Sequence, residues 1–131
     1  MEKENIRVNY TLACDQVIVD INGKISIIGI FNKINAKSTP AVHTRFTITT
    51  NIMGHPGTYY TEKIEIINLQ DNKPIAFVEG KLEFKEAGMS NFFGNFINTL
   101  FPVFGKYWIK VSIDGEPITD PDKNYVLVEK N

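Results

Sequence analysis

Residues 17–31 read VIVDINGKISIIGIF and predict the first hairpin of the chain. The pair Asn22-Gly23 is typical of type I′ turns, because both central residues of that turn need a positive φ. A two-residue loop at this pair would place Ile21 directly opposite Lys24. The stretch therefore predicts two antiparallel strands joined by a tight turn.

The second half of this hairpin departs from a regular strand. Ile27 and Ile28 are adjacent apolar residues, which interrupts the alternation, and Gly29 follows them. A glycine inside a strand often marks a bulge or a sharp bend. The pattern indicates either a β-bulge or a strand that crosses between two sheets.

Strand patterns continue along the rest of the chain. In residues 6–15 and 105–114, side chains alternate as in half-buried strands, with Val8, Tyr10, Leu12 and Cys14 on one face of the first and Tyr107, Ile109, Val111 and Ile113 on one face of the second. Turn sequences such as HPG and QDNKP separate further segments, which gives seven or eight strands at intervals of about ten residues. The pattern predicts one all-β domain over residues 1–131. The expected architecture is a single antiparallel β-sandwich, immunoglobulin-like or C2-like, with a partly open barrel as the second choice.

The composition fits one ordinary globular domain. The chain has 131 residues, of which 43% are hydrophobic and 22% are charged. Fourteen basic and fifteen acidic side chains give a net charge of −1. Such a balance provides no general attraction to nucleic acid or to an anionic membrane, and little repulsion against self-association. We therefore expect a protein partner or a homo-oligomer, with no nucleic acid and no membrane.

Cysteine usage and hydropathy bear on the cellular location. Cys14 is the only cysteine, so neither an internal disulfide nor a multi-cysteine metal site can form. The first ten residues are charged and do not resemble a signal peptide, and no run of about 18 apolar residues indicates a membrane span. These features predict a cytoplasmic protein in which Cys14 is a small buried hydrophobic residue.

The residues that usually carry catalysis are few and dispersed. His43 and His55 lie at opposite ends of one strand pattern, about ten residues or more than about 30 Å apart, so they would not bind one metal ion. No metal-ligand spacing, glycine-rich phosphate loop or nucleophile elbow is present. Asp120 and Asp122 are typical of turns, and calcium binding through such loop aspartates is less favoured. We expect no catalytic residue, no metal and no cofactor.

Residues 91–102, NFFGNFINTLFP, contain four of the nine phenylalanines of the chain. On a helical wheel, the apolar residues occupy one arc of about 180°, and glycine, asparagine and threonine occupy the rest. This separation predicts a short amphipathic helix near residues 90–101 that Pro102 terminates. The helix would either cover an open end of its own core or bind another protein, whereas a membrane is less favoured because its polar face has no Lys or Arg. The candidate interaction residues are Phe92, Phe93, Phe96, Ile97, Leu100 and Phe101.

Several short motifs carry a resemblance to a known family. They are Gly29-Ile30-Phe31, Pro40 with Val42-His43, and Phe101-Pro102-x-x-Gly105-x-Tyr107 followed by Asp114-Gly115. Over about Val8 to Ile118, the chain resembles a small family of prokaryotic and phage proteins that is known only as a domain of unknown function. The resemblance implies a compact β-sandwich and no activity, substrate or catalytic residue. Residues 91–100 are more aromatic here than in that family, which makes them a candidate for what is particular to this protein.

Three functions of different class remain open. The favoured one is a non-catalytic interaction or structural module that binds itself or another protein, with the aromatic segment as a possible contact. The alternative is a small-ligand-binding sandwich with a pocket between the predicted helix and the sheets, lined by Tyr60, Phe84 and Trp108. A hydrolase with a site near His43 or the loop aspartates is the least favoured.

Overall fold

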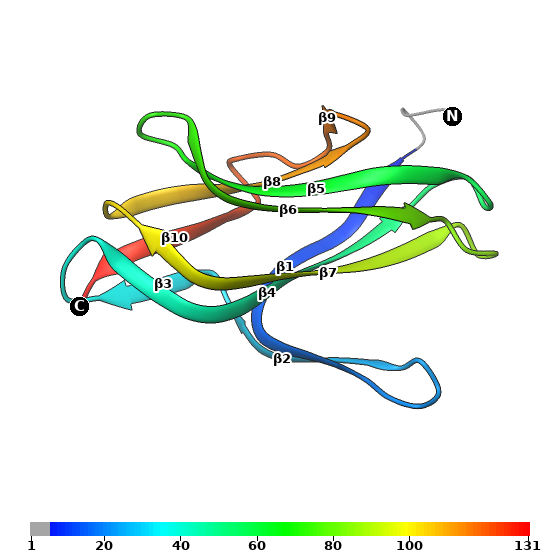
Figure 1. The fold of residues 1–131 in the computed structure, drawn as a ribbon, viewed down its shortest axis with the longest axis horizontal. Helices are drawn as coiled ribbons and strands as arrows, with labels where there is room; N and C mark the ends of the chain where they lie inside the picture. Colours follow the sequence, from blue (N-terminus) through cyan, green and yellow to red (C-terminus); the bar gives the residue numbers. More distant parts are fainter. Residues whose placement is uncertain (1–5) are drawn as a thin grey trace.

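The computed structural model describes residues 6–131, which form ten strands in two sheets around one core (Figure 1). The first sheet has the strand order β2-β1-β4-β7, and the second has the order β3-β10-β8-β5-β6, with the short β9 beside β8. The strands are β1 Arg7–Val19, β2 Ile25–Phe31, β3 Lys33–Ala36, β4 Ala41–Met53, β5 Tyr59–Asn68, β6 Lys73–Glu83, β7 Met89–Phe101, β8 Gly105–Ile113, β9 Glu116–Pro117 and β10 Tyr125–Lys130.

The all-β class is confirmed, but the predicted single immunoglobulin-like or C2-like sandwich with a short helix is wrong. One of the two sheets curves into a half-barrel, and β3 pairs with β10 in parallel. The chain passes from the first sheet to the second at Asn32, between β2 and β3. Residues 6–131 contain no helix, and so none long and apolar enough to cross a membrane.

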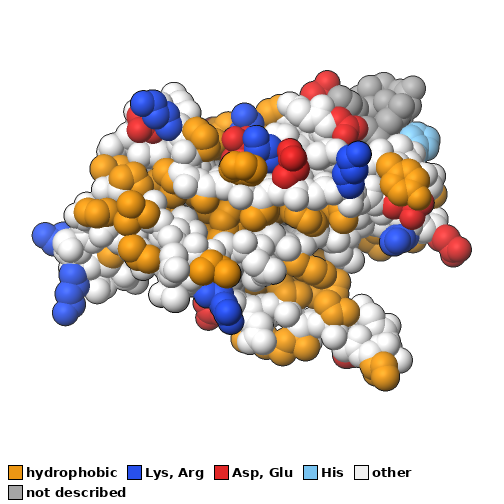
Figure 2. Space-filling model, in the orientation of Figure 1, with side chains coloured by type: hydrophobic (Ala, Val, Ile, Leu, Met, Phe, Trp, Pro, Cys, Tyr) orange, Lys and Arg blue, Asp and Glu red, His pale blue; other side chains and the backbone are white. Residues whose placement is uncertain are grey.

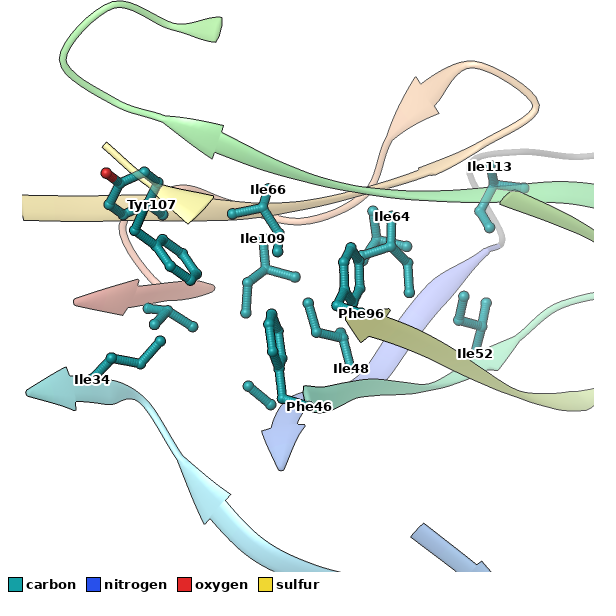
Figure 3. Close-up of a cluster of buried hydrophobic side chains, with 14 of the residues drawn as sticks. Ile34, Phe46, Ile48, Ile52, Ile64, Ile66, Phe96, Tyr107, Ile109 and Ile113 are labelled. Carbon is teal, nitrogen blue, oxygen red and sulfur yellow. The ribbon is translucent and has the colours of Figure 1, made fainter. Parts of the chain in front are cut away.

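The core lies between the two sheets and consists mainly of isoleucine and aromatic side chains (Figure 3). Phe46 of β4 stacks on Phe96 of β7, with ring centroids 5.2 Å apart. Phe101 meets Tyr107 of β8 edge to face at 4.9 Å. The Tyr107 hydroxyl donates a hydrogen bond to the Val103 carbonyl at 2.7 Å and accepts one from the Val103 N–H, which ties the β7–β8 connection to the core. Burial of these apolar surfaces is the main source of stability.

The aromatic segment is strand β7, not the predicted helix. It pairs with β4 along its whole length, from Ala41 opposite Phe101 to Met53 opposite Met89. Asn98 has a φ of +52°, and around it the strand changes which side chains point inward. The predicted arc is therefore divided: Phe92, Phe96 and Phe101 pack in the core, whereas Phe93, Ile97 and Leu100 lie on the outer side.

This change of face explains why the segment has the periodicity of a helix. Before Asn98 the even-numbered residues point inward, and after it the odd-numbered residues do so. The inward positions on either side of the change are therefore Phe96 and Thr99. They are three residues apart, which is a helical spacing, whereas inward residues of a regular strand are two apart. Pairing with β4 satisfies the backbone in the extended form, so the strand prevails over the apparent helical pattern.

The first hairpin forms, but its turn is longer than the predicted type I′ turn. Pairing ends at Val19 opposite Ile25, so Ile21 does not face Lys24 across a two-residue loop. The Asp20 carboxylate accepts hydrogen bonds from the N–H groups of Asn22 and Lys24 at 2.8 and 2.9 Å. Only Gly23 of the turn has a positive φ, +82°. An aspartate that caps its own turn, with glycine in the left-handed position, favours this wider loop.

This hairpin leaves the body of the protein as a projecting ribbon, which we call the arm, residues 15–29. Strand β1 pairs with β4 only as far as Cys14 opposite Thr47, and beyond that point it pairs only with β2. In Figure 1 the arm runs away from the sheet below β1 and β4. Gly29 sits opposite Asp15 where the arm departs, with a φ of +70° and no room for a side chain. The expected irregularity at Gly29 is thus the bend at the base of the arm.

We expect Gly29→Ala to destabilise the protein by more than Gly23→Ala. Both glycines have a positive φ, which costs a residue with a Cβ about 1–2 kcal/mol. A Cβ at Gly23 meets nothing within 4 Å, whereas a Cβ at Gly29 would lie 2.7 Å from Asp15 Cγ. Urea unfolding of both variants measures the difference between these two losses of free energy.

The double variant Asp15→Ala/Gly29→Ala isolates the contact with Asp15. Removal of the carboxylate should reduce the loss caused by Gly29→Ala towards that of Gly23→Ala, because only the backbone term and the Cβ of residue 15, at 3.0 Å, then remain. Equal losses in Gly23→Ala and Gly29→Ala would show that the arm does not bend against Asp15 as described.

Candidate functional site

The arm exposes apolar side chains to an unusual extent. Ile18 is 43% exposed, Val19 51%, Ile28 45%, Ile30 at the base 57%, and Ile21 at the tip 99%. An isolated two-stranded ribbon is marginally stable in water unless one of its faces is buried. The arm is therefore a two-stranded ribbon whose apolar side chains are largely uncovered within residues 6–131.

A hollow of about 410 Å³ separates the arm from the outer face of β4 and β7, and we call it the arm groove. In Figure 2 the arm projects below the body of the protein, and the arm groove lies beside it. Two of the predicted interaction residues, Phe93 and Ile97, contribute apolar surface from β7. The residues that line the arm groove are Asp15, Gln16, Val17, Val19, Arg45, Thr47, Phe93, Asn95 and Ile97.

Polar side chains hold the floor of the groove in place. Thr47 Oγ1 donates a hydrogen bond to Asn95 Oδ1 at 2.8 Å, which links β4 to β7. Further along the same sheet, Asn51 accepts a hydrogen bond from Asn9 at 2.6 Å and donates one to Asn91 at 2.7 Å. These cross-strand bonds fix side chains that would otherwise be mobile, so the outer face of the sheet is a defined surface rather than a variable one.

The other predicted interaction residues do not share this surface. Phe96 and Phe101 are only 4% and 1% exposed, and Phe92 packs partly against the core. Leu100 is half exposed but does not line the arm groove. The structure thus brings Phe93 and Ile97 together at the groove and assigns the three inward phenylalanines to the hydrophobic core.

The three residues predicted for a ligand pocket do not lie together, because Trp108 is separated from the other two. Tyr60 and Phe84 stack on each other at 4.4 Å and are both buried. Trp108 lies on β8 between Tyr107 and Ile109, which point into the core, so its own side chain lies on the opposite face of the sheet. Without the helix that was to cover it, the predicted pocket has no counterpart in residues 6–131.

Glu62 is a fully buried carboxyl group that the sequence analysis did not single out. It lies on β5, and its Oε2 accepts a hydrogen bond from Thr50 Oγ1 of the other sheet at 2.6 Å. Burial raises the pKa of Glu62 to about 7 and the pKa of the neighbouring Tyr60 to about 12. Glu62 is fully buried, and its hydrogen bond to Thr50 joins the two sheets.

The two histidines remain apart, as expected. His43 on β4 packs against Phe31 and Phe46, with ring centroids 5.5 and 5.2 Å away, and burial lowers its pKa. His55 lies in the turn beyond the other end of β4. Among residues 6–131, no group of three His, Cys, Asp or Glu side chains is arranged to hold a metal ion. Cys14 is buried, as predicted, and burial raises the pKa of its thiol.

The fold and the surface define an all-β protein of two sheets with a projecting apolar arm. Residues 9–121 match a protein family that is described as a family of unknown function (DUF6941), and the chain belongs to that family. The expected resemblance to an uncharacterised family is thereby confirmed. No curated protein matches the chain.

The projection of this hairpin as an arm was not predicted from the sequence. Its exposed residues come from the same stretch, 17–31, that predicts the hairpin. The signal was the adjacent pair Ile27-Ile28, because two neighbouring apolar residues on a strand point to opposite faces. A hairpin that is apolar on both faces is covered on both faces either by other parts of its own chain or by another molecule.

Proposed function

We propose that this chain is a non-catalytic protein-interaction module that binds a protein partner through the arm and the arm groove. The observation that carries the proposal is the projecting arm, whose tip residue Ile21 is 99% exposed. Contiguous exposed apolar surface of this kind marks interaction sites in proteins that are otherwise well packed.

The chemistry of the groove supports a protein as the ligand. Phe93 and Ile97 offer apolar surface, and Thr47 and Asn95 supply hydrogen-bonding groups between them. One acidic and one basic residue, Asp15 and Arg45, lie among the lining residues. Aromatic and aliphatic anchors combined with hydrogen-bonding groups are typical of protein interfaces.

The cellular setting is also part of the proposal. The resemblance to prokaryotic and phage proteins favours such an origin. The single cysteine favours a reducing compartment, because proteins of oxidising compartments commonly contain disulfides. We therefore place the module in the cytoplasm of a prokaryotic cell or of a cell infected by a phage.

A photo-crosslinking residue at the tip of the arm tests the proposal. Benzoylphenylalanine replaces Ile21 in one variant and Tyr59, which is 73% exposed on β5, in a matched control. Each variant is irradiated in the cells that naturally make the protein. We expect a discrete crosslinked protein species from position 21 and none from position 59. No product at position 21, or the same products at both positions, would contradict the arm as the contact surface.

A further inference from the structure

We propose that the partner of the arm is a second copy of this chain, and that the two copies join by antiparallel pairing of their β2 strands. The inference rests on the proposed function and names its partner. It would extend the first sheet across a two-fold axis, with the order β7-β4-β1-β2 in one copy followed by β2-β1-β4-β7 in the other.

Strand β2 is an open edge. Within residues 6–131 it pairs with β1 on one side and with no strand on the other. Its sequence, ISIIGIF, contains no charged residue and no proline. Natural proteins protect an exposed edge strand with such residues, because unpaired N–H and C=O groups otherwise recruit another strand. Strand β2 lacks this protection.

The strands that end the two sheets elsewhere, β3, β6 and β7, are protected, which makes β2 the exception among them. Strand β3 has only four residues and carries Lys33, which forms an ion pair with Glu129 at 3.2 Å. Strand β6 begins with Lys73-Pro74 and also contains Lys81.

Strand β7 is shielded by β6, although the two do not form a ladder. Gly80 of β6 lies against the Phe92 ring, where an added Cβ would be 2.9 Å from the nearest ring atom. A Cβ added at Gly94 of β7 would lie 2.6 Å from Val78 of β6. Side-chain packing thus covers this edge, and β2 remains the edge that is long, neutral and uncovered.

The β2 strand is complementary to itself. In an antiparallel pair centred on Ile28, this residue faces Ile28 of the other copy, and Ser26 faces Ile30. Ile28 and Ile30 are 45% and 57% exposed in the single chain, and pairing would bury part of that surface. No charged residue lies within the paired segment, so no like charges oppose each other.

Mass action and charge favour a second copy of this chain, rather than a strand of another protein, as the partner that pairs with β2. Every copy presents the same unprotected edge, so the concentration of matching edges rises with the concentration of the protein itself. The net charge of −1 adds little repulsion between copies. A two-fold axis uses the β2 edges of both copies at once and leaves neither of them open, so pairing through β2 stops at the dimer.

Light scattering over a concentration series tests the dimer with the 131-residue chain. We expect the wild type to approach twice the chain mass of 14.9 kDa as its concentration rises. Ile28→Lys places two lysines opposite each other across the axis and should weaken dimerisation at least about tenfold. The matched control is Phe77→Lys, at a site that is 60% exposed on β6, and it should dimerise like the wild type.

Disulfide crosslinking tests the same contact between two β2 strands at a defined position. This test does not require the Ile28→Lys variant to fold. Directly opposed residues of antiparallel strands have Cβ atoms about 4.5–5.5 Å apart. Ile28→Cys should therefore form an intermolecular disulfide under mild oxidation at least about tenfold faster than Phe77→Cys. The native Cys14 is buried and should not contribute.

The outcomes separate this inference from the proposed function. A wild-type protein that is monomeric at every concentration overturns the dimer, and so do equal crosslinking rates at positions 28 and 77. If a crosslinked species of another protein still forms from position 21, the interaction module stands and its partner is foreign. If position 21 also yields no product, both proposals fail.

Discussion

Phe96→Asp should unfold the protein at 25 °C, whereas Ile97→Asp, one residue later, should leave it folded. Phe96 is 4% exposed and stacks on Phe46 in the core, but Ile97 is 65% exposed on the outer side of β7. Loss of a buried phenylalanine costs about 3–5 kcal/mol, and a buried carboxylate adds to this, against a total stability of about 5–15 kcal/mol. A surface substitution usually changes stability by about 0.5 kcal/mol or less.

Circular dichroism and urea unfolding of both variants measure the contrast. In the helix predicted from the sequence, residues 96 and 97 would lie on the same apolar arc, and both substitutions would have similar effects. Comparable losses of stability in the two variants would therefore contradict the strand. Thr99 on the inward side and Leu100 on the outward side give a second pair beyond Asn98, where the facing of the strand changes.

Stability should fall as the pH rises from about 4.5 to about 7, because Glu62 keeps its proton in the folded state. Its pKa is raised from 4.5 to about 7 by burial, so in this range the unfolded chain releases a proton that the native chain holds. The free energy of unfolding should therefore decrease through this range and level off above pH 7. The difference between these two pKa values corresponds to about 3 kcal/mol.

Glu62→Gln removes the titrating group while it retains an oxygen that can accept the hydrogen bond from Thr50. The variant should be about as stable as the wild type at pH 4 and more stable at pH 8, as measured by urea unfolding at each pH. Glu79→Gln, at an exposed site on β6, should follow the wild-type profile. If the Glu62→Gln profile has the same slope as the wild type between pH 4.5 and 7, Glu62 does not keep its proton in the folded state.

Much of the strand content can be predicted from the sequence, because local alternation reflects a strand with one buried face. In β8, the four residues Tyr107, Ile109, Val111 and Ile113 are buried as predicted. The prediction for β1 holds only in part. A bulge between Val8 and Tyr10 reverses the facing, so that Ala13 rather than Leu12 points into the core with Ile48.

The places where the prediction fails have a common physical cause. A bulge in β1 and a left-handed residue in β7 each change which side chains point inward, and a fixed period cannot represent such a change. In β7, the change at Asn98 produced an apparent helical pattern. The architecture also depends on how far the sheet curves and where the chain changes sheets, which are properties of long-range packing rather than of any single segment.

The candidate site was only partly predictable. The hairpin, its turn region and an irregularity at Gly29 follow from the sequence, and Phe93 and Ile97 were among the interaction candidates. The separation of β1 from β4 after Cys14 could not be inferred, because it depends on the pairing of strands that are distant in sequence. For that reason the exposed isoleucines of residues 17–31 look like ordinary core residues in the sequence alone.

Hydrogen exchange of the purified protein at increasing concentrations tests most directly whether the arm is a contact surface for a second copy. We expect the amides of residues 25–30 to exchange more slowly as the concentration rises. Amides of the protected edge strand β6, residues 73–83, should exchange at a constant rate. Exchange in residues 25–30 that is independent of concentration, or slowed equally in β6, would contradict pairing through β2.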